Sequence, residues 1–534
     1  MKHLKPKKKN GWKAAAVILS VLVILLGFST VWLAKDYIWP AQSIEPAGET
    51  PEQASEPVEQ VKADADVKHT VKFSAFDQDP IVMTVADGEN LFLPNGPEMP
   101  GYTFLAWRNA DGTIEHDSSV RVYQDMEYRA EYAVAFKNAG QMEEHEAYMF
   151  LDENNMFHPN AALSRGELVT ILYKMLNINS AGTGYFADIT DESEYHEAAA
   201  TLKSLNLIGG ERLHPEDPVL YGELFNILAK LFPEPADEHV FTNVQAENEY
   251  YKGFCLAKEK GWLLDDELDP YAEVTRKEAA RIINMLTGRK GVQHEDLSLT
   301  GTIVDVSSDD AYFSDIAEAV IPHKCDPSAE TETWTESEPV ETLAAGRFFI
   351  GTDLHCIKEN GDPCLNETVD GILFDENGIA STGDAELDAY VRQKLPELVD
   401  PEAMSSEDML RKIYDFVRDD SFYLRGAIYE TGETGWEVEE AVKMLSTGKG
   451  NCYSYAATFW ALTRAIGYDT VCYSGTIGTH SNPHGWTEIE FDGTPYIFDP
   501  TLEYEQWYGP GTHTFERFFK KPYESVTGWL YARG

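Results

Sequence analysis

Cysteine is scarce in this chain, with six among 534 residues. That density is far below the density of small disulfide scaffolds. No Cys-x-x-Cys spacing occurs, so the sequence offers no cysteine-based zinc site, and we expect neither a metal nor a cofactor. The cysteines are Cys255, Cys325, Cys356, Cys364, Cys452 and Cys472.

Basic residues are also few, because 43 Lys and Arg stand against 91 Asp and Glu, for a formal net charge of −48. The first 13 residues hold six of the lysines, so the remainder is more acidic still. Such a body repels nucleic acid and anionic membrane surfaces. A nucleic-acid partner is therefore excluded, while the charge says little about the fold.

One long uncharged run is present near the N-terminus. Residues 1–13 are basic, and residues 14–34, AAAVILSVLVILLGFSTVWLA, carry no charge. A helix of this length can cross about 30 Å of hydrocarbon, and it is longer than the apolar part of a cleaved signal peptide. The sequence predicts a transmembrane anchor at 14–34, a cytoplasmic tail at 1–13 and an extracellular, cell-wall-associated body.

Residues 35–67 are rich in Pro, Glu, Gln and Ala, which indicates a solvated linker. Residues 68–135 then read as short alternating strands separated by turn signals, typical of a small β module. The run PGYTFLAWRNADGTI followed by YRAEY resembles the Listeria–Bacteroides surface repeat. That resemblance implies a β-grasp-like fold, with a spacer or adhesive role and no chemistry.

An internal repeat occupies residues 140–290. Three X-His/Asp-Pro turns end at Pro159, Pro215 and Pro270, and three glutamates recur with the same steps. A shared period of this size indicates tandem supersecondary units. After each proline comes a run with apolar residues at helical spacing, so each unit is expected to be helix, loop, helix. The glutamates are Glu167, Glu223 and Glu278.

Two of these units contain the sequences SRGE, 164–167, and TRKE, 275–278. They resemble S-layer homology repeats, a family that holds surface proteins on pyruvylated wall polysaccharide. The resemblance implies wall-polymer binding through Arg165 and Arg276, whose planar guanidinium groups suit carboxylates. The middle unit departs from the motif, with Tyr221 in place of arginine.

The same S/T-x-x-E spacing has a purely structural interpretation. Ser164 and Thr275 can cap helices, and Glu167 and Glu278 can close the capping boxes. This interpretation holds whether or not the arginines bind a polymer.

Residues 291–345 are polar and irregular and are expected to be a linker with a degenerate repeat. Residues 346–384 read as short strands with Asp-Gly and Asn-Gly turns, a β-hairpin segment. Cys356 and Cys364 could pair across such a hairpin, or remain free.

From about residue 385 to 534 the pattern changes to amphipathic helices followed by strands. Cys452 follows a glycine-rich turn, Gly448 to Gly450, and opens a strongly apolar helical run. A helix N-terminus carries unpaired N–H groups and partial positive charge, which favour a thiolate. A cysteine in this place is a candidate nucleophile, although a buried structural cysteine would fit the local pattern equally well.

A thiolate needs a proton partner, and His484 lies at the start of a predicted strand. The turn signal Asp492-Gly493 predicts a hairpin in which Phe491 faces Thr494. In that register Asp499 is a diagonal neighbour of His484 on one face. The arrangement fits a nucleophile, a base and a residue that orients the base.

The motifs GNCYSYA, HGW and DPT, in this order, resemble the transglutaminase-like branch of the papain-type cysteine fold. The resemblance covers about residues 385–534 and implies an α+β papain-like domain. It implies Cys452 as nucleophile, His484 as base and Asp499 as the residue that orients it. The amide of Cys452 is one expected oxyanion donor.

The sequence thus predicts a multidomain cell-surface enzyme for acyl transfer through a thioester, resolved by an amine or by water. The expected partners are wall polysaccharide and a protein or peptidoglycan peptide substrate. Two alternatives stay open. One is a non-catalytic wall-binding or adhesive protein, and the other is a surface cysteine protease.

Overall fold

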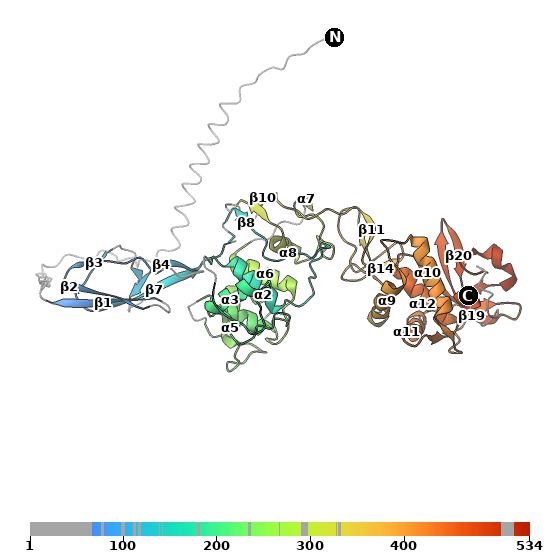
Figure 1. The fold of residues 1–534 in the computed structure, drawn as a ribbon, viewed down its shortest axis with the longest axis horizontal. Helices are drawn as coiled ribbons and strands as arrows, with labels where there is room; N and C mark the ends of the chain where they lie inside the picture. Colours follow the sequence, from blue (N-terminus) through green and yellow to red (C-terminus); the bar gives the residue numbers. More distant parts are fainter. Residues whose placement is uncertain are drawn as a thin grey trace, which may run out of the picture. The chain divides into compact units, whose positions relative to one another are not determined.

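The structure is a computed structural model (Figure 1). It describes a set of segments from residue 67 onward. These are 67–75, 79–97, 102–109, 114–115, 119–137, 139–140, 142–178, 182–232, 237–265, 267–289, 297–326, 328, 333–503 and 517–533.

The expected membrane anchor needs a correction. Within the segments that the structure describes, no helix has both the length and the apolar character needed to cross a bilayer. The segment 14–34, on which that expectation rested, lies outside the described residues, as do the tail 1–13 and most of the linker 35–67. Among the residues that it describes, the structure thus offers no helix for the transmembrane element of the expected fold class or for a single-pass membrane location.

A small β module comes first in the described chain. Its five-stranded sheet has the order β2-β1-β7-β4-β5, and β1 and β7 are parallel while the other neighbours are antiparallel. Phe73, Trp107 and Tyr128 pack together as its aromatic core. Its strands are β1 (Lys68–Ser74), β2 (Ile81–Ala86), β3 (Asn90–Phe92), β4 (Tyr102–Asn109), β5 (Ile114–Glu115), β6 (Ser119–Arg121) and β7 (Met126–Val134).

The repeat region is helical, and its three motif positions open three equivalent helices. Ser164 and Thr275 accept from the N–H groups of Glu167 and Glu278, and both capping boxes are complete, which confirms the structural interpretation of those residues. The helices are α2 (Arg165–Met175), α3 (His196–Ser204), α4 (Tyr221–Ala229), α5 (Tyr251–Lys260), α6 (Arg276–Thr287), α7 (Leu297–Thr300) and α8 (Phe313–Val320).

The three repeats form a closed ring. A β-bridge joins each repeat to the next, and the third joins back to the first. Paired backbone hydrogen bonds at the start of each motif helix follow the same cyclic order. The bridges are Ser164 with Pro218, Leu220 with Glu273, and Ala162 with Thr275.

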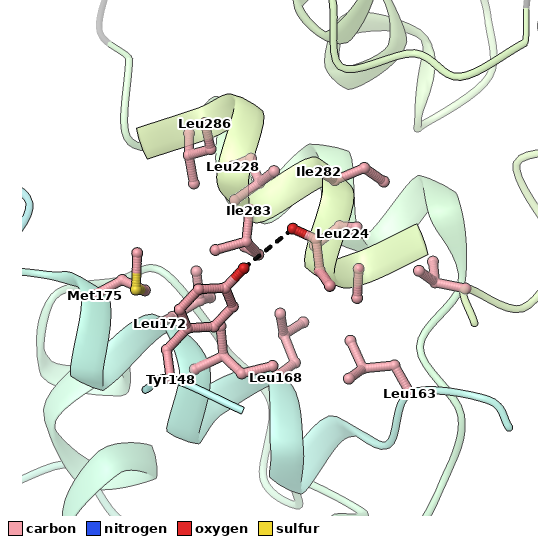
Figure 2. Packing of buried hydrophobic residues seen from close by; sticks show 14 of the residues in the cluster. Tyr148, Leu163, Leu168, Leu172, Met175, Leu224, Leu228, Ile282, Ile283 and Leu286 are labelled. Atoms are coloured by element: carbon pink, nitrogen blue, oxygen red, sulfur yellow. Dashed lines mark hydrogen bonds between the residues drawn. The ribbon is translucent and has the colours of Figure 1, made fainter. Parts of the chain in front are cut away.

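The core of this ring forms where α2, α4 and α6 converge (Figure 2). Leu168 and Leu172 come from α2, Leu224 and Leu228 from α4, and Ile283 from α6, and all five are buried. Burial of a side chain of this size stabilises the fold by about 1.5–3 kcal/mol. A single repeat could not cover such a face, which explains why the motif helices occur together.

A small three-stranded sheet, in the order β10-β9-β8, adjoins the last helix of this region. It joins a strand that precedes the first repeat to two strands that follow α8. Its strands are β8 (Glu144–His145), β9 (His323–Cys325) and β10 (Trp334–Ser337).

Residues 346–384 form two small antiparallel sheets. Cys356 and Cys364 lie in this segment, and all six cysteines of the chain are free. The two thiols are buried side by side, and burial together with a hydrogen bond to Cys356 raises the pKa of Cys364 to about 12. The strands are β11 (Gly346–Ile350), β12 (Asp353–Ile357), β13 (Glu367–Val369), β14 (Ile372–Phe374) and β15 (Ala380–Ser381).

The C-terminal part is α+β. Its helices are α9 (Ala385–Leu398), α10 (Ser406–Asp419), α11 (Glu437–Thr447), α12 (Cys452–Ala465) and α13 (Pro500–Glu503), with the short η1 (Tyr523–Trp529) near the end. The helix α12 is buried along most of its length because α9, α10 and α11 surround it while β18 and β19 close its remaining side.

An antiparallel sheet in the order β21-β20-β19-β18-β22 supports α12 (Figure 1). Its last strand comes from the extreme C-terminus and pairs with β18, so the chain end is built into the sheet. The strands of this part are β16 (Phe422–Tyr423), β17 (Lys449–Gly450), β18 (Thr470–Ile477), β19 (Asn482–Phe491), β20 (Thr494–Phe498), β21 (Lys521–Pro522) and β22 (Ala532–Arg533).

Candidate active site

Cys452 is the first residue of α12, as the sequence predicts. Asn451 caps this helix, and its side-chain oxygen accepts from the N–H groups of Tyr453 and Ser454. The Asn451 amide also donates to the carbonyl of Ala427 at 2.6 Å. The cap therefore ties the helix start to the preceding loop and sets where the thiol lies.

The strand before the helix is short and tightly packed. Tyr423 pairs with Gly450 in a parallel bridge between β16 and β17. A side chain at Gly450 would collide with Ser454, since an added Cβ would lie 2.2 Å from the Ser454 Cβ. Glycine at this position lets the backbone lie close against the first turn of α12.

His484 and Asp499 are brought together by the hairpin of β19 and β20. Phe491 pairs with Thr494 as predicted, and Asp492 and Gly493 form the two-residue turn with positive φ at both. The His484 Nε2 lies 2.6 Å from the Asp499 Oδ2. This bond leaves Nδ1 as the ring nitrogen available to another partner.

That partner is Cys452. Burial of the ring lowers the pKa of His484, but the charges of Asp499 and Cys452 and the hydrogen bonds to both raise it more, to about 10. All three side chains are buried, with 7% of Cys452, 5% of His484 and none of Asp499 exposed. The three residues that the sequence singles out therefore form one contact chain, thiol to imidazole to carboxylate.

Tyr531, from the C-terminal end of the chain, completes the surroundings of Asp499. Its hydroxyl donates to the Asp499 Oδ2 at 2.7 Å, the same oxygen that contacts His484. The other oxygen, Oδ1, accepts from the Leu502 N–H at 3.2 Å. Burial and the Asp499 charge raise the pKa of Tyr531 well above its usual value, so the hydroxyl stays a donor.

A second polar network lies beside the first and reaches the surface at Arg533. Trp486, fully buried, donates to Glu488 at 3.1 Å and contacts the Tyr523 hydroxyl at 3.2 Å. Arg533 forms an ion pair with Glu488 through two nitrogens. Trp486 thus packs against His484, and its indole N–H bonds to Glu488 and Tyr523 rather than to the thiol.

The loop between β16 and α11 is held against the start of α12. Ser474 on β18 donates to the carbonyls of Glu430 and Glu433, both at 2.8 Å, and the Gly432 N–H donates to the Ser474 carbonyl at 2.9 Å. With the Asn451 bond to Ala427, these contacts fix the loop at both of its ends.

One residue near Cys452 escaped the sequence analysis. Burial, followed by the charge of Cys452, raises the pKa of the Tyr423 hydroxyl, which places this tyrosine within electrostatic reach of the thiol. Tyr423 is the second residue of a two-residue strand, and nothing in the local sequence indicates such a role. Its position opposite Gly450 follows from the parallel pairing of β16 with β17, which only the fold reveals.

Three other residues of this part of the chain have simpler roles. Cys472 is buried within β18, and burial raises its pKa well above the usual value. Tyr455, from the first motif, is buried and donates to the carbonyl of Ser421 at 2.9 Å. His480 is exposed in the β18–β19 turn and contacts Thr479.

Arg165 and Arg276 each bridge neighbouring repeats. Arg165 pairs with Glu223 at 2.5 Å. Arg276 pairs with Glu167, and its remaining nitrogens donate to the carbonyls of Phe157 and Phe150 at 2.8 Å.

In the middle repeat, Tyr221 takes the place of the arginine, as the sequence shows. Burial and the Glu278 carboxylate raise the pKa of Tyr221. Each motif helix thus presents its first residue to the capping glutamate of the next repeat, in the cyclic order of the ring. The tyrosine accordingly fills the position that arginine holds in the other two repeats.

Comparison with known proteins agrees with the C-terminal geometry. Residues 393–500 match the family model described as the transglutaminase-like superfamily. This stretch includes all three contact-chain residues. Residues 393–500 form a transglutaminase-like domain. The match supports a cysteine-dependent enzyme of that superfamily.

Among solved structures, the chain is similar to one titled "Putative Cysteine Protease" from Cytophaga hutchinsonii. The identity is 13%, the TM-score is 0.17, and the match covers 29% of this chain and 53% of the other. No curated protein matches.

Proposed function

We propose that the transglutaminase-like domain transfers acyl groups through a thioester on Cys452. The observation that carries this proposal is the 2.6 Å bond between His484 and Asp499, next to a cysteine at a helix N-terminus. Asp499 holds the ring so that Nδ1 serves the thiol, and the charge on Asp499 stabilises the imidazolium. The acyl donor is an amide of a protein or of a cell-wall peptide.

The first half-reaction forms a bond from the Cys452 Sγ to the amide carbonyl carbon. The tetrahedral intermediate collapses as the C–N bond breaks, and His484 gives its Nδ1 proton to the leaving amine. An amine or a water molecule then attacks the thioester while His484 accepts its proton. The C–S bond breaks, and Cys452 leaves as the thiolate.

The oxyanion formed in each half-reaction needs hydrogen-bond donors. The Cys452 amide lies in the first turn of α12, where helical N–H groups have no intrahelical acceptor. We assign this amide to the oxyanion, and a donor of this kind is worth about 10²–10³ in kcat.

The proposal is tested by the rate at which iodoacetamide alkylates Cys452 as a function of pH, read by peptide mass spectrometry. Because the thiol is mostly covered, the shape of the pH profile is informative rather than the absolute rate. The wild-type thiol should react at pH 6–7, and His484→Ala should move the profile toward an ordinary thiol, near pH 8.5. Cys472 in the same domain is the internal control, since it is buried and has no base.

An unchanged profile in His484→Ala would show that the pair is not assembled and would favour the non-catalytic alternative. If the profile does shift, a second experiment separates transfer from hydrolysis. The chain is incubated with a peptide substrate and a labelled primary amine. Incorporation of the label identifies a transferase. Cleavage without incorporation identifies a protease.

A second candidate function concerns the repeats. A cavity of about 330 Å³ lies between α2 and α4, and its lining includes Arg165, Arg212 and Lys230. Glu223 also lines the cavity and pairs with Arg165, so Arg212 and Lys230 supply the remaining positive charge. Two such cationic side chains beside apolar residues suit an anionic carbohydrate, which is what the S-layer resemblance implies. We propose that this cavity, rather than the surroundings of Arg276, binds the wall polysaccharide.

The test is co-sedimentation of the chain with purified pyruvylated wall polysaccharide. Arg212→Ala should weaken binding, because its guanidinium lines the cavity. Lys277→Ala on α6, which removes a cation away from the cavity lining, serves as the control. Equal binding by both variants would exclude the cavity.

A further inference from the structure

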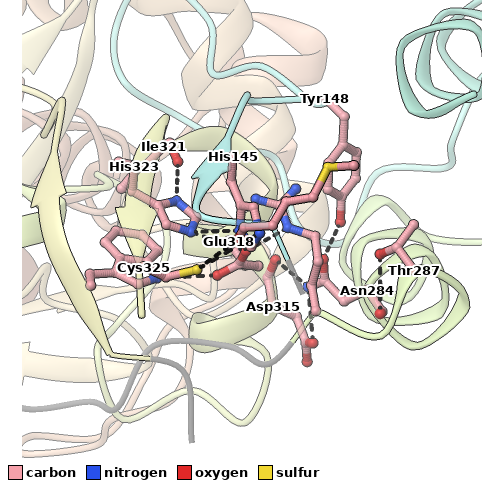
Figure 3. A network of polar contacts seen from close by, with 12 residues as sticks. His145, Tyr148, Asn284, Thr287, Asp315, Glu318, Ile321, His323 and Cys325 are labelled. Atoms are coloured by element: carbon pink, nitrogen blue, oxygen red, sulfur yellow. Dashed lines mark hydrogen bonds and ion pairs between the residues drawn. The ribbon is translucent and has the colours of Figure 1, made fainter. Parts of the chain in front are cut away.

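Two histidines and a glutamate meet in the protein interior outside the transglutaminase-like domain (Figure 3). His145 ends β8, Glu318 lies in α8 and His323 begins β9. None of the three side chains has any exposed surface. Neither the proposed acyl transfer nor the cavity between α2 and α4 uses them.

Three of their polar atoms form a nearly equilateral triangle. The His145 Nδ1 lies 3.0 Å from the Glu318 Oε1 and 3.0 Å from the His323 Nε2. The His323 Nε2 lies 3.2 Å from the same carboxylate oxygen.

The far nitrogen of each ring already has a partner (Figure 3). The His323 Nδ1 lies 2.8 Å from the carbonyl of Ile321, which can only accept, so Nδ1 carries the hydrogen. The His145 Nε2 lies 3.9 Å from the Cys325 Sγ. Metal-binding histidines commonly show this arrangement, in which a hydrogen bond at one nitrogen turns the lone pair of the other toward the metal.

Two ring lone pairs and a carboxylate oxygen repel one another at these distances unless a positive group lies between them. That group is either a proton or a metal ion. Three atoms about 3 Å apart can all lie about 2.1 Å from a single point, and this is the usual distance from zinc to imidazole nitrogen or carboxylate oxygen.

We propose that His145, Glu318 and His323 form a binding site for a divalent metal ion of the zinc class. Two imidazoles and one carboxylate are ligands that suit Zn²⁺ better than Mg²⁺ or Ca²⁺, which prefer oxygen. The ion would join β8 to α8 and β9. His145 and Glu318 are 173 residues apart in the sequence. Such a buried ion has a structural role, because it stabilises the fold and does not bind a substrate.

Arg289 bears on the strength of this site. Its Nε lies 2.6 Å from the Glu318 Oε1, and its side chain is also fully buried. A guanidinium on the liganding oxygen competes with a divalent cation for the same negative charge. Arg289→Met should therefore bind Zn²⁺ at least 10-fold more tightly than the parent chain, whereas a network bridged only by protons would gain no metal affinity.

The first experiment is a titration with Zn²⁺ alone on the full chain after chelator treatment. It uses a Cys452→Ala background, because Cys452 and His484 could bind zinc themselves. One ion per chain is expected, and His145→Gln and His323→Gln should each weaken binding at least 10-fold. His196→Gln, at a half-exposed histidine of α3, should bind like the parent.

A chain that binds no Zn²⁺, or glutamine variants that bind as well as the parent, would overturn the proposal. Because a glutamine variant could fail to fold, zinc-edge X-ray absorption on the Cys452→Ala chain provides a test that needs no change in the cluster. A shell of nitrogen and oxygen near 2.1 Å with imidazole scattering supports the site. A sulfur ligand near 2.3 Å contradicts it.

Discussion

The hydroxyl of Tyr531 donates to the Asp499 Oδ2 at 2.7 Å, and the same oxygen contacts the His484 Nε2 at 2.6 Å. The segment between η1 and β22 therefore sets the position of the carboxylate that orients the histidine. This contact is possible because β22 pairs with β18 at the edge of the sheet.

Tyr531→Phe should lower both stability and activity. Loss of a hydrogen bond to a buried charged group costs about 1–3 kcal/mol, and a less firmly held Asp499 should reduce the reactivity of Cys452 at pH 6–7. The measurement is the alkylation profile of Cys452 together with thermal unfolding. Tyr523→Phe is the matched control, since its hydroxyl bonds to Glu488 instead.

Both tyrosine variants should destabilise the domain, but only Tyr531→Phe should change the Cys452 profile. If the two variants gave the same profile, Tyr531 would have a structural role alone.

The stability of the transglutaminase-like domain should fall as the pH rises above about 6.5. The folded state raises the pKa of His484 to about 10, against about 6.5 in an unfolded chain. The stabilisation is fully present below pH 6.5 and is lost as the pH rises through 10. Between these values the slope from this group is at most about 1.4 kcal/mol per pH unit.

Urea midpoints at pH 6, 8 and 9.5, read from α12 peptides by pulsed hydrogen exchange, follow this domain within the longer chain. His484→Gln should show a shallower decline, because glutamine does not titrate. If the urea midpoints of both proteins fell in parallel as the pH rises, the pH dependence of stability would arise from another group.

Asn451→Ala should loosen the start of α12. The asparagine satisfies two helix N–H groups and holds Ala427, so its loss should cost about 1 kcal/mol or more and displace the thiol. Asp384→Ala removes the cap of α9, which is remote in sequence from Cys452, and gives a control of similar cost.

The comparison is the Cys452 alkylation rate at pH 7 in the two cap variants at equal folded fraction. A lower rate is expected for Asn451→Ala only. Similar rates would show that the cap does not position the thiol.

Gly450→Ala should act by steric overlap. The added methyl would lie against Ser454, the third residue of α12, and relief of such an overlap costs about 1–3 kcal/mol. We expect a lowered unfolding midpoint and slower reaction of Cys452. Gly528→Ala, where an added Cβ meets no atom within 4 Å, should leave both quantities unchanged.

Local patterns were enough to foresee several features of this molecule. The S/T-x-x-E spacing predicted the capping boxes of α2 and α6, because a cap depends on four consecutive residues. The Asp492-Gly493 turn predicted the register of β19 and β20, because a two-residue turn leaves only one pairing. That register by itself places His484 and Asp499 on one face.

The sequence could not say what the repeat arginines contact. Arg165 and Arg276 look alike in their motifs, yet each pairs with a glutamate of another repeat. A guanidinium can bind a ligand carboxylate or a neighbouring glutamate equally well, and only closure of the ring decides between them.

The sequence by itself determined the cysteine at a helix start, the hairpin that carries its base and the period of the repeats. All of these follow from interactions within a few residues or across one tight turn. Only the tertiary structure decided that Tyr531 supports Asp499 and that His145, Glu318 and His323 converge. Those contacts join segments up to 178 residues apart, and they form because burial of apolar surface, not local pattern, determines which segments pack together.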